Sequence, residues 1–588
     1  MLKLNRKEQW PSYPYYSLVL PEIPFMFKSD ALMFCRSANF LSFLLLSLLF
    51  ISCKKTETPP IIPPEIKIVI KQSEIALKNE EYFLGRRIEY VIQNLPAGTK
   101  DSVLFSMENS RIAKVDAKGI VWPQAAGTTY VTLKLFEGEV FAKIKVVVTD
   151  ANGYKLRIVL NDKGTSEVNV NQPERFLSPK AISRRRNQNI PVDALDLPIS
   201  PVYLKAIEAV GGKIVSKSKW LNSVVIYCED QFLLDQYSAL PFVKDVKKVW
   251  QGRKNSGPQT AYADVPQIVS NHTNQTHFDY GVATAQISVN NGQVLHQNGY
   301  KGAGIDIAVL DMGFPNLKKN EAFRNVNVKG AKSFVFENND PYATGYHGLD
   351  VTSCMAVNLP GKYVGTAPEA NYWLFRTEDE ASEFPIEEDY WVAAAEYADS
   401  AGVDIINSSL YYATSYSIDY GRYKYEDMDG KSAVSSRGAN VAASKGILIF
   451  NCAGNDQSWV GAPADAPGVI AVGSVINKSQ EATSTSFGIT VDGRMKPDVM
   501  AYGAYCAVYT TNGILKYTSG TSFASPIMCG LAACLWQAYP KLTAADMREV
   551  LRKSADRAGQ PVIPFGFGVP DMQRAMSLCA VIAASKRK

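Results

Sequence analysis

Four short segments carry polar residues of the types that hydrolytic chemistry needs, and they follow one another along the chain. The last of them is Gly520-Thr521-Ser522, which directly precedes an apolar helix pattern. A serine at the start of a helix has an exposed hydroxyl, backbone N–H groups without helical partners and the positive end of the helix dipole. These conditions suit a nucleophile that must also stabilise an oxyanion. The earlier segments supply its candidate partners, which are Asp311, His347 and Asn455.

Two of these partners stand where short apolar runs end, which is typical of buried parallel strands. Asp311 follows the run 304–310, and Asn455 follows the run 446–450 after three intervening small residues and an asparagine. His347 opens an amphipathic segment. Because open parallel sheets place their sites at the carboxyl ends of the strands, we expect these side chains to meet at one edge.

Apolar runs and helical patterns alternate between these segments, which predicts an α/β domain with a doubly wound parallel sheet. Further strands are expected at 371–375, 403–408 and 469–475, and helices at 387–401, 433–445 and 543–554. Gly402 is placed to end the first of these helices, and Thr543 with Asp546 to cap the last.

The order Asp311, His347, Ser522 is that of subtilisin, and with Asn455 the segment 281–582 resembles the catalytic domain of the subtilases, the subtilisin-like serine peptidases. The resemblance implies that Ser522 attacks a peptide carbonyl, with His347 moving the proton. It also implies that Asp311 orients the imidazole and that Asn455 donates its amide to the oxyanion. On this mechanism no cofactor is required, and the substrates are proteins or peptides.

A segment before Asn455 resembles the subtilase strand that pairs with extended substrate and lines the primary specificity pocket. The predicted substrate-binding residues are Ser408, Ser409, Leu410 and Tyr411. The family has two glycines after the leucine, whereas this chain has Tyr411 and Tyr412, whose bulk is expected to narrow or close that pocket. Asp350 adds a carboxylate near His347, and we expect it to raise the pKa of that imidazole.

Two other functions stay open at this stage. A catalytically inactive subtilase fold that serves as a surface binding protein is favoured by Tyr411-Tyr412, although the presence of all four chemical residues opposes it. An ester hydrolase is opposed by the residue order and by the lack of a Gly-x-Ser-x-Gly elbow.

The beginning of the chain is typical of export. Within 34–53, Arg36 precedes an apolar run too short to span a bilayer, as in a signal peptide. The run ends at Ile51-Ser52-Cys53, which resembles a bacterial lipobox. This implies a lipid anchor on Cys53 and a lipoprotein of the cell envelope, at the outer membrane or the cell surface. An ordinary signal peptide is the alternative, and we expect translation to begin at Met33, with 1–32 an upstream stretch.

Three further segments precede the catalytic one. A proline-rich tether, 54–64, leads to 65–150, whose alternating pattern predicts an all-β domain and resembles bacterial Ig-like (group 2) domains. Residues 154–255 suggest a small α+β domain with two strands and two helices, at the place of a subtilase propeptide. The segment 256–280 is a linker, and a maturation cut is expected between about 252 and 280.

Composition limits the remaining choices. The net charge of the 588 residues is only +5, which argues against a nucleic-acid partner. The basic run Arg184–Arg186 is interpreted as a solvent-exposed helix face. The nine cysteines lack the spacing of a metal site, and those outside the signal are expected to be free buried thiols. The loop 425–430 is interpreted as an acidic turn, and the resemblance leaves structural calcium open.

Overall fold

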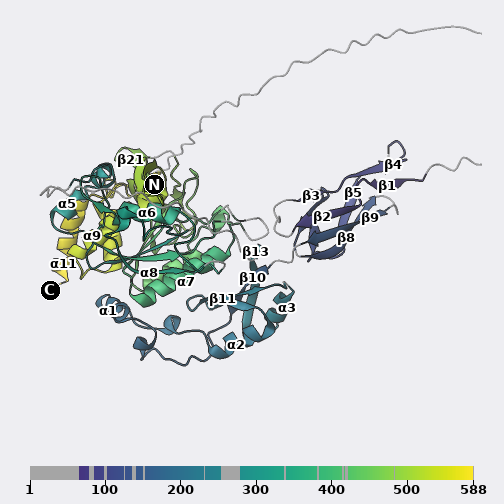
Figure 1. The fold of residues 1–588 in the computed structure, drawn as a ribbon, viewed down its shortest axis with the longest axis horizontal. Coiled ribbons are helices and arrows are strands. Elements are labelled where there is room, and N and C mark those ends of the chain that lie inside the picture. Colours follow the sequence, from purple (N-terminus) through teal and green to yellow (C-terminus); the bar gives the residue numbers. More distant parts are fainter. Residues whose placement is uncertain are drawn as a thin grey trace, which may run out of the picture. The chain divides into compact units, whose positions relative to one another are not determined.

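The computed structural model describes the chain between residues 65 and 586 (Figure 1). Within these limits it leaves out 79–84, 99–101, 125, 136–140, 150–152, 231, 253–278, 337–338, 381–382, 414–415, 417–421 and 482–483. The predicted signal, Cys53, the tether and most of the linker therefore lie outside the described residues. In the described part, no helix has both the length and the hydrophobicity needed to cross a membrane.

Strands alone make up the regular structure of the described residues from 65 to 149, as the alternating pattern predicted. The strands are β1 (Lys67–Ile70), β2 (Glu74–Lys78), β3 (Arg86–Arg87), β4 (Tyr90–Gln93), β5 (Val103–Met107), β6 (Ala113–Val115), β7 (Ile120–Pro123), β8 (Gly127–Leu135) and β9 (Phe141–Thr149). The main sheet has the order β2-β9-β8-β5, and alternate residues of β8, such as Val131 and Leu133, enter its core. The Ig-like assignment itself stays a prediction.

A four-stranded antiparallel sheet follows, in the order β11-β12-β10-β13. Its elements are β10 (Gly153–Leu160), α1 (Pro179–Asn187), α2 (Pro201–Val210), β11 (Lys213–Ser218), β12 (Ser223–Cys228), α3 (Leu233–Ser238) and β13 (Val243–Gly252). The two predicted strands and two predicted helices are present, while β11, α3 and β13 were not anticipated. One face of the sheet packs on α2 and α3 through a core that includes Ile207 and Tyr237.

The third region contains the predicted doubly wound sheet, with strand order β15-β18-β14-β19-β20-β21-β22 and β25 beside β21. All neighbours are parallel except β21 and β22. The strands are β14 (Asp306–Asp311), β15 (Asn327–Ser333), β18 (Asn371–Arg376), β19 (Ile405–Ser408), β20 (Leu448–Cys452), β21 (Val469–Asn477), β22 (Gln480–Glu481) and β25 (Val499–Tyr502). Short hairpins outside it are β16 (Asn358–Leu359) with β17 (Tyr363–Val364), β23 (Gly488–Ile489) with β24 (Met495–Lys496), and β26 (Cys506–Tyr509) with β27 (Leu515–Thr518).

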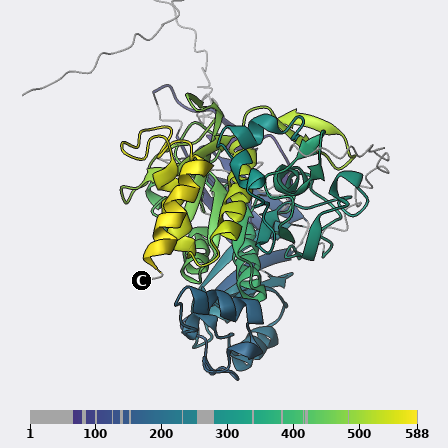
Figure 2. The ribbon, with the colours of Figure 1, turned by 90° about the vertical axis from the view of Figure 1, so that its left-hand side faces the viewer.

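Helices cover both faces of this sheet, because each strand sends alternate apolar side chains to opposite sides. The helices are α4 (Thr284–Ser288), α5 (Gln293–Gln297), α6 (His347–Ala356), α7 (Ile386–Ala401), α8 (Val434–Ser444), α9 (Thr521–Ala538), α10 (Ala544–Ser554) and α11 (Met572–Ser585). Ile307 and Val309 of β14 enter the core with α6 and α9, whereas Ala308 and Leu310 enter the core with α7 and α8. Helices α9 and α11 pack against each other in Figure 2.

Local signals at the helix ends agree with the sequence. Gly402 ends α7 in a left-handed conformation, with φ of 91°. Thr543 and Asp546 form a capping box at the start of α10. Among the described residues the seven cysteines are all free and buried, as expected.

The second face of the four-stranded sheet packs on the peptidase-like region, chiefly on α7. Tyr227 and Trp250 share a core with Ile386 and Tyr390 of that helix. Polar contacts surround this core: the guanidinium of Arg157 donates two bonds of 2.7 and 2.6 Å to the carboxylate of Asp389. The carboxylate of Glu396 accepts from Ser218 and from the backbone of Lys219 and Trp220.

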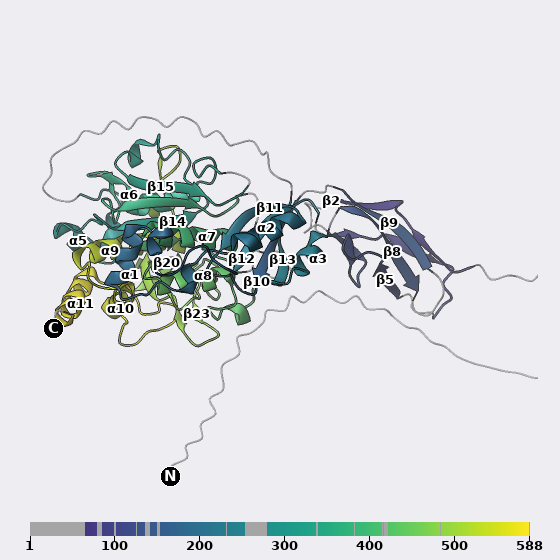
Figure 3. The same cartoon turned by 90° about the horizontal axis from the view of Figure 1, so that it is seen from below.

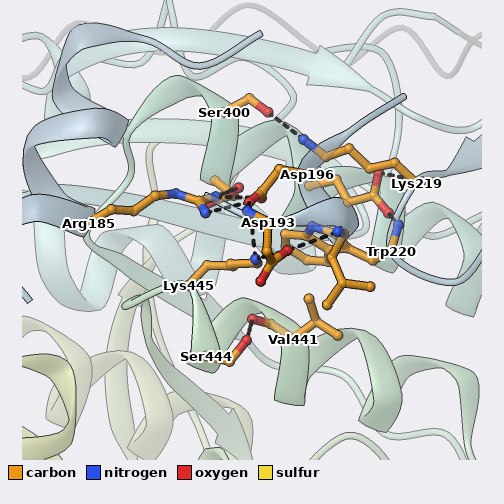
Figure 4. A network of polar contacts seen from close by, with 12 residues as sticks. Arg185, Asp193, Asp196, Lys219, Trp220, Ser400, Val441, Ser444 and Lys445 are labelled. Carbon is orange, nitrogen blue, oxygen red and sulfur yellow. Dashed lines mark hydrogen bonds and ion pairs between the residues drawn. The ribbon is translucent and has the colours of Figure 1, made fainter. Parts of the chain in front are cut away.

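The basic run on α1 corrects the sequence interpretation. Arg186 is exposed, but Arg184 and Arg185 are only 5% and 1% exposed and both bind the carboxylate of Asp399 on α7. Arg185 also makes two bonds of 2.9 Å to Asp196 (Figure 4). The prediction of a solvent-exposed face was wrong. One carboxylate that neutralises Arg185 belongs to Asp399, which lies 214 residues away in the sequence, so no local pattern could show that these arginines are buried.

The same network joins α1 to the segment after α8. The ammonium of Lys445, which is 1% exposed, lies 2.8 Å from Asp193 and 3.1 Å from Asp196. Figures 3 and 4 show α1 and its neighbours against α7 and α8. The contact between the two regions therefore combines an apolar core with paired charges that are removed from water.

We expect Asp399→Ala to lower the free energy of unfolding by about 3–5 kcal/mol, because two buried guanidiniums lose a shared carboxylate. The measurement is urea denaturation of the full chain, followed by tryptophan fluorescence. Glu549→Ala is the control, since Glu549 forms an exposed pair with Lys553 on α10 and its loss should cost less than about 0.5 kcal/mol. Equal effects of the two substitutions would contradict this assignment.

Candidate active site

Asp311 and His347 meet at the carboxyl edge of the sheet, as predicted. Asp311 is the last residue of β14 and is fully buried, and its Oδ1 lies 2.8 Å from Nδ1 of His347. The same oxygen accepts a bond of 2.8 Å from the backbone N–H of Met312. His347 is the first residue of α6, and its side chain is 25% exposed. The carboxylate is therefore held by the strand, while the imidazole reaches solvent.

Two glycines allow this close approach. A β-carbon on Gly348 would lie 2.9 Å from Cβ of Asp311, so a side chain there would push α6 away from β14. Gly313 has φ of 153°, and a β-carbon there would lie 1.9 Å from the carbonyl oxygen of Thr344. Both positions therefore require glycine for the carboxylate and the imidazole to meet.

Thr521, the residue before Ser522, holds Asn455 next to the start of α9. Ser522 is the second residue of α9 and is half-buried, after Gly520 with φ of 150°. The side-chain oxygen of Asn455 accepts bonds of 2.9 and 3.1 Å from the backbone N–H and the hydroxyl of Thr521. Because its oxygen is occupied in this way, the amide nitrogen of Asn455 is the group left to act as a donor beside Ser522.

The predicted substrate-binding segment touches the same helix. The hydroxyl of Ser409 donates a bond of 2.8 Å to the carbonyl of Ser522, and the carbonyl of Leu410 accepts one of 2.8 Å from the Asn451 amide. Ser408 ends β19, where its hydroxyl accepts from the indole of Trp391. The ends of β19 and β20 are thus joined to the start of α9.

His347 and Ser522 lie on helices that pack together, but in the described structure no hydrogen bond joins them. The imidazole ring of His347 lies 5.9 Å from the ring of Phe523, the residue after Ser522.

Cys452 lies at the end of β20, and hydrogen bonds with the hydroxyls of Thr521 and Ser522 act to lower the pKa of its thiol. Burial nevertheless raises the pKa of the Cys452 thiol to about 12, so this thiol stays protonated near neutral pH and is a poor nucleophile.

Comparisons with known proteins agree with this geometry. The model of the Subtilase family matches residues 302–569, and that of the Peptidase S8 propeptide domain of Bacteroidota matches 155–262. Subtilisin from Bacillus pumilus is 30% identical over 289 residues, which are 48% of this chain and 94% of that protein. The chain belongs to the subtilase family of serine peptidases.

More distant relatives extend the match toward the N-terminus. Subtilisin NAT from Bacillus subtilis subsp. natto is 28% identical over 377 residues, 63% of this chain and 84% of that protein. Serine protease AprX from Bacillus subtilis (strain 168) is 27% identical over 357 residues, 55% of this chain and 72% of that protein. The subtilase therefore shares with these proteins a stretch longer than the α/β sheet region alone.

A second carboxylate acts on the histidine of this subtilase. Asp350 lies one turn along α6, is 1% exposed and forms a 2.8 Å ion pair with Lys516 on β27. Burial opposes a charge on His347, but the carboxylates of Asp311 and, less strongly, Asp350 outweigh it and raise the pKa of the imidazole. Lys516 acts in the opposite direction. The predicted effect of Asp350 is confirmed in direction.

The two tyrosines after Leu410 differ in their surroundings. Tyr412 is buried away from Asn455 and donates a bond of 2.6 Å to Glu378. Burial, the largest influence, raises the pKa of Glu378 to about 8, against the effect of this bond. Tyr411 packs against Gly454, next to Asn455. Only the first tyrosine therefore reaches the expected pocket.

The carboxylates of the loop 425–430 accept hydrogen bonds from neighbouring backbone N–H groups. Asp427 accepts from the backbone of Lys424, and Asp429 accepts bonds of 2.7 Å from the N–H groups of Lys431 and Ser432. These carboxylates hold the turn, as the interpretation of an acidic turn expects. Structural calcium elsewhere in the subtilase stays a prediction.

Sequence reasoning missed two residues of this site. Thr521 orients Asn455, and its place inside Gly-Thr-Ser was the available signal. Lys516 balances Asp350, but nothing in its sequence surroundings distinguishes it from other exposed lysines.

Asp350→Asn should lower the pKa of His347, because it removes a negative charge that favours the imidazolium, and Lys516→Met should raise it. The measurement is an NMR titration of the histidine ring signals in Ser522→Ala protein. His296 is the internal control, because burial lowers its pKa to about 4 and neither substitution touches it. An unchanged His347 pKa in Asp350→Asn would contradict the electrostatic role of Asp350.

Proposed function

We propose that this subtilase is an exported endopeptidase that cleaves peptide bonds in extended segments through Asp311, His347 and Ser522. The observation that carries the proposal is the 2.8 Å hydrogen bond between buried Asp311 and His347, whose helix α6 packs on α9, which holds Ser522 in its first turn. This bond fixes the tautomer in which Nδ1 carries the proton, so Nε2 is available as a base.

The reaction follows from these positions. The hydroxyl of Ser522 attacks the peptide carbonyl while Nε2 of His347 accepts its proton, and the resulting imidazolium is stabilised by Asp311. His347 then returns the proton to the leaving amine, and water repeats the cycle on the acyl-enzyme. The base and nucleophile need not be hydrogen-bonded beforehand, because such contacts often tighten only when substrate is bound.

The oxyanion is stabilised by Asn455 and by the start of α9. The amide nitrogen of Asn455 lies beside the first turn of α9, where the backbone N–H of Ser522 has no acceptor within the helix and the helix dipole adds positive potential. The substrate main chain pairs with Ser408, Ser409 and Leu410, and the bond from the Ser409 hydroxyl to the carbonyl of Ser522 joins this segment to the nucleophile.

The α+β region from 154 to 252 is proposed to be a propeptide that guides folding and inhibits the enzyme. Support comes from the family match at 155–262 and from its packing on α7 through Arg157 and Trp250. Cleavage between about 252 and 280 then separates it from the peptidase. At the other end, Ile51-Ser52-Cys53 supports export and lipid attachment at Cys53 in the cell envelope.

A fluorophosphonate probe should label the wild-type chain and fail to label Ser522→Ala, because only an activated serine reacts. Ser577→Ala, on an exposed part of α11, should keep full labelling. An unlabelled wild type that still folds would favour the alternative reading of an inactive surface binding protein.

Asn455→Ala should lower kcat by about 10²–10³ with little change in KM, the factor that such an amide contributes in subtilisin itself. Asn455→Asp retains an oxygen that can accept from Thr521 but removes the donor, so it should be impaired to at least the same degree. Steady-state kinetics on a fluorogenic peptide measures both. Near-normal kcat in Asn455→Asp would remove the amide from the mechanism.

Mass spectrometry of the chain ends should find that the active peptidase begins between about 252 and 280, whereas Ser522→Ala stays uncut. The N-terminal fragment should begin at a lipid-modified Cys53. Active enzyme that keeps 154–250 covalently attached would overturn the proposed cut, and an unmodified Cys53 would overturn the anchor.

A further inference from the structure

A narrow slot beside Asn455 has walls of bare backbone, and the ring of Tyr411 fills it. A β-carbon on Gly454 would lie 2.4 Å from Cε2 of Tyr411, and one on Gly461 would lie 2.6 Å from the same atom. Real β-carbons do not approach so closely, so the ring touches the main chain on both sides. Glycine at both positions therefore leaves room for the ring of Tyr411.

The tyrosine is fixed at both ends. Its hydroxyl donates a bond of 3.3 Å to the carbonyl of Trp459, and burial raises its pKa, so the hydroxyl stays protonated. The preceding carbonyl, of Leu410, is held by the amide of Asn451 at 2.8 Å. The ring is thus anchored to the two segments that form the slot.

The slot adjoins the reacting serine. The hydroxyl of Thr521 accepts a bond of 3.1 Å from the N–H of Gly454, so one wall is joined to the residue before Ser522. Ser409 is bonded to Ser522 and Asn455 to Thr521, so on the proposed pairing of substrate with 408–410 the residue that brings its carbonyl to Ser522 and Asn455 directs its side chain between the segments 409–411 and 453–455. That space is the slot that Tyr411 occupies.

We propose that Tyr411 makes the enzyme selective for peptide bonds that follow a small residue, namely glycine, alanine or serine. A larger side chain extends into volume that the ring already fills, and close-packed walls cannot yield without displacing main chain. This selectivity rests on the proposed function of Ser522 and Asn455. Tyr412 takes no part in it, because its side chain is buried against Glu378.

The test uses two fluorogenic peptides that differ only in the residue before the cleaved bond, alanine or phenylalanine. Wild-type enzyme should prefer alanine in kcat/KM by about tenfold or more, a discrimination that pocket shape readily provides. Tyr411→Ala should raise the ratio of kcat/KM for the phenylalanine peptide to that for the alanine peptide by about tenfold or more. Tyr411→Phe keeps the ring and should keep the wild-type preference.

Equal cleavage of both peptides by wild-type enzyme, or an unchanged preference in Tyr411→Ala, would overturn the proposal. Fluorophosphonate labelling of the same samples separates this failure from failure of the proposed function. Labelling of both proteins with unchanged preference counts against Tyr411 alone. Labelling of Tyr411→Ala but not of wild type would mean that the ring closes the site, and this result would also overturn the proposed selectivity. Labelling of neither protein would overturn both the selectivity and the proposed function.

Discussion

The hydrogen bond between Asp311 and His347 places the strictest demand on this structure. A fully buried carboxylate must meet an imidazole that reaches solvent, and this happens only where a parallel strand ends beside the start of a helix. Gly348 removes the side chain that would separate α6 from β14. A second ion pair joins Asp350, one turn along the same helix, to Lys516. Asp350 raises the pKa of His347 and Lys516 lowers it.

The start of α9 organises the rest of the site in the same way. Thr521 binds Asn455 through both its backbone and its hydroxyl, and the same hydroxyl accepts from the N–H of Gly454. One residue therefore places both the proposed oxyanion donor and one wall of the slot that Tyr411 fills. On the two proposals, catalysis and selectivity share a single set of contacts, so a change that shifts Thr521 is expected to affect both.

Helix α7 connects the peptidase to the preceding domain. Its carboxylates Asp389, Glu396 and Asp399 bind that domain, and the last of them pairs with two arginines of α1. On the proposed maturation, cleavage leaves the lipid anchor on the N-terminal fragment. These paired charges lie across the contact between that fragment and the peptidase, and the strength of the contact depends on how far it excludes water.

The sequence by itself determined the order of the chemical residues, the alternation of strands and helices, and the helix ends at Gly402 and Thr543, because these signals are local or periodic. It also predicted that Asp311 and His347 would meet, since parallel strands end at one edge. It missed β11, α3 and β13, and it placed Arg184 and Arg185 in solvent. Only the tertiary structure decided that these arginines are buried, that Lys516 faces Asp350 and that Tyr411, not Tyr412, enters the slot. Burial and the pairing of charges depend on residues hundreds of positions apart, and no local pattern records which of them become neighbours.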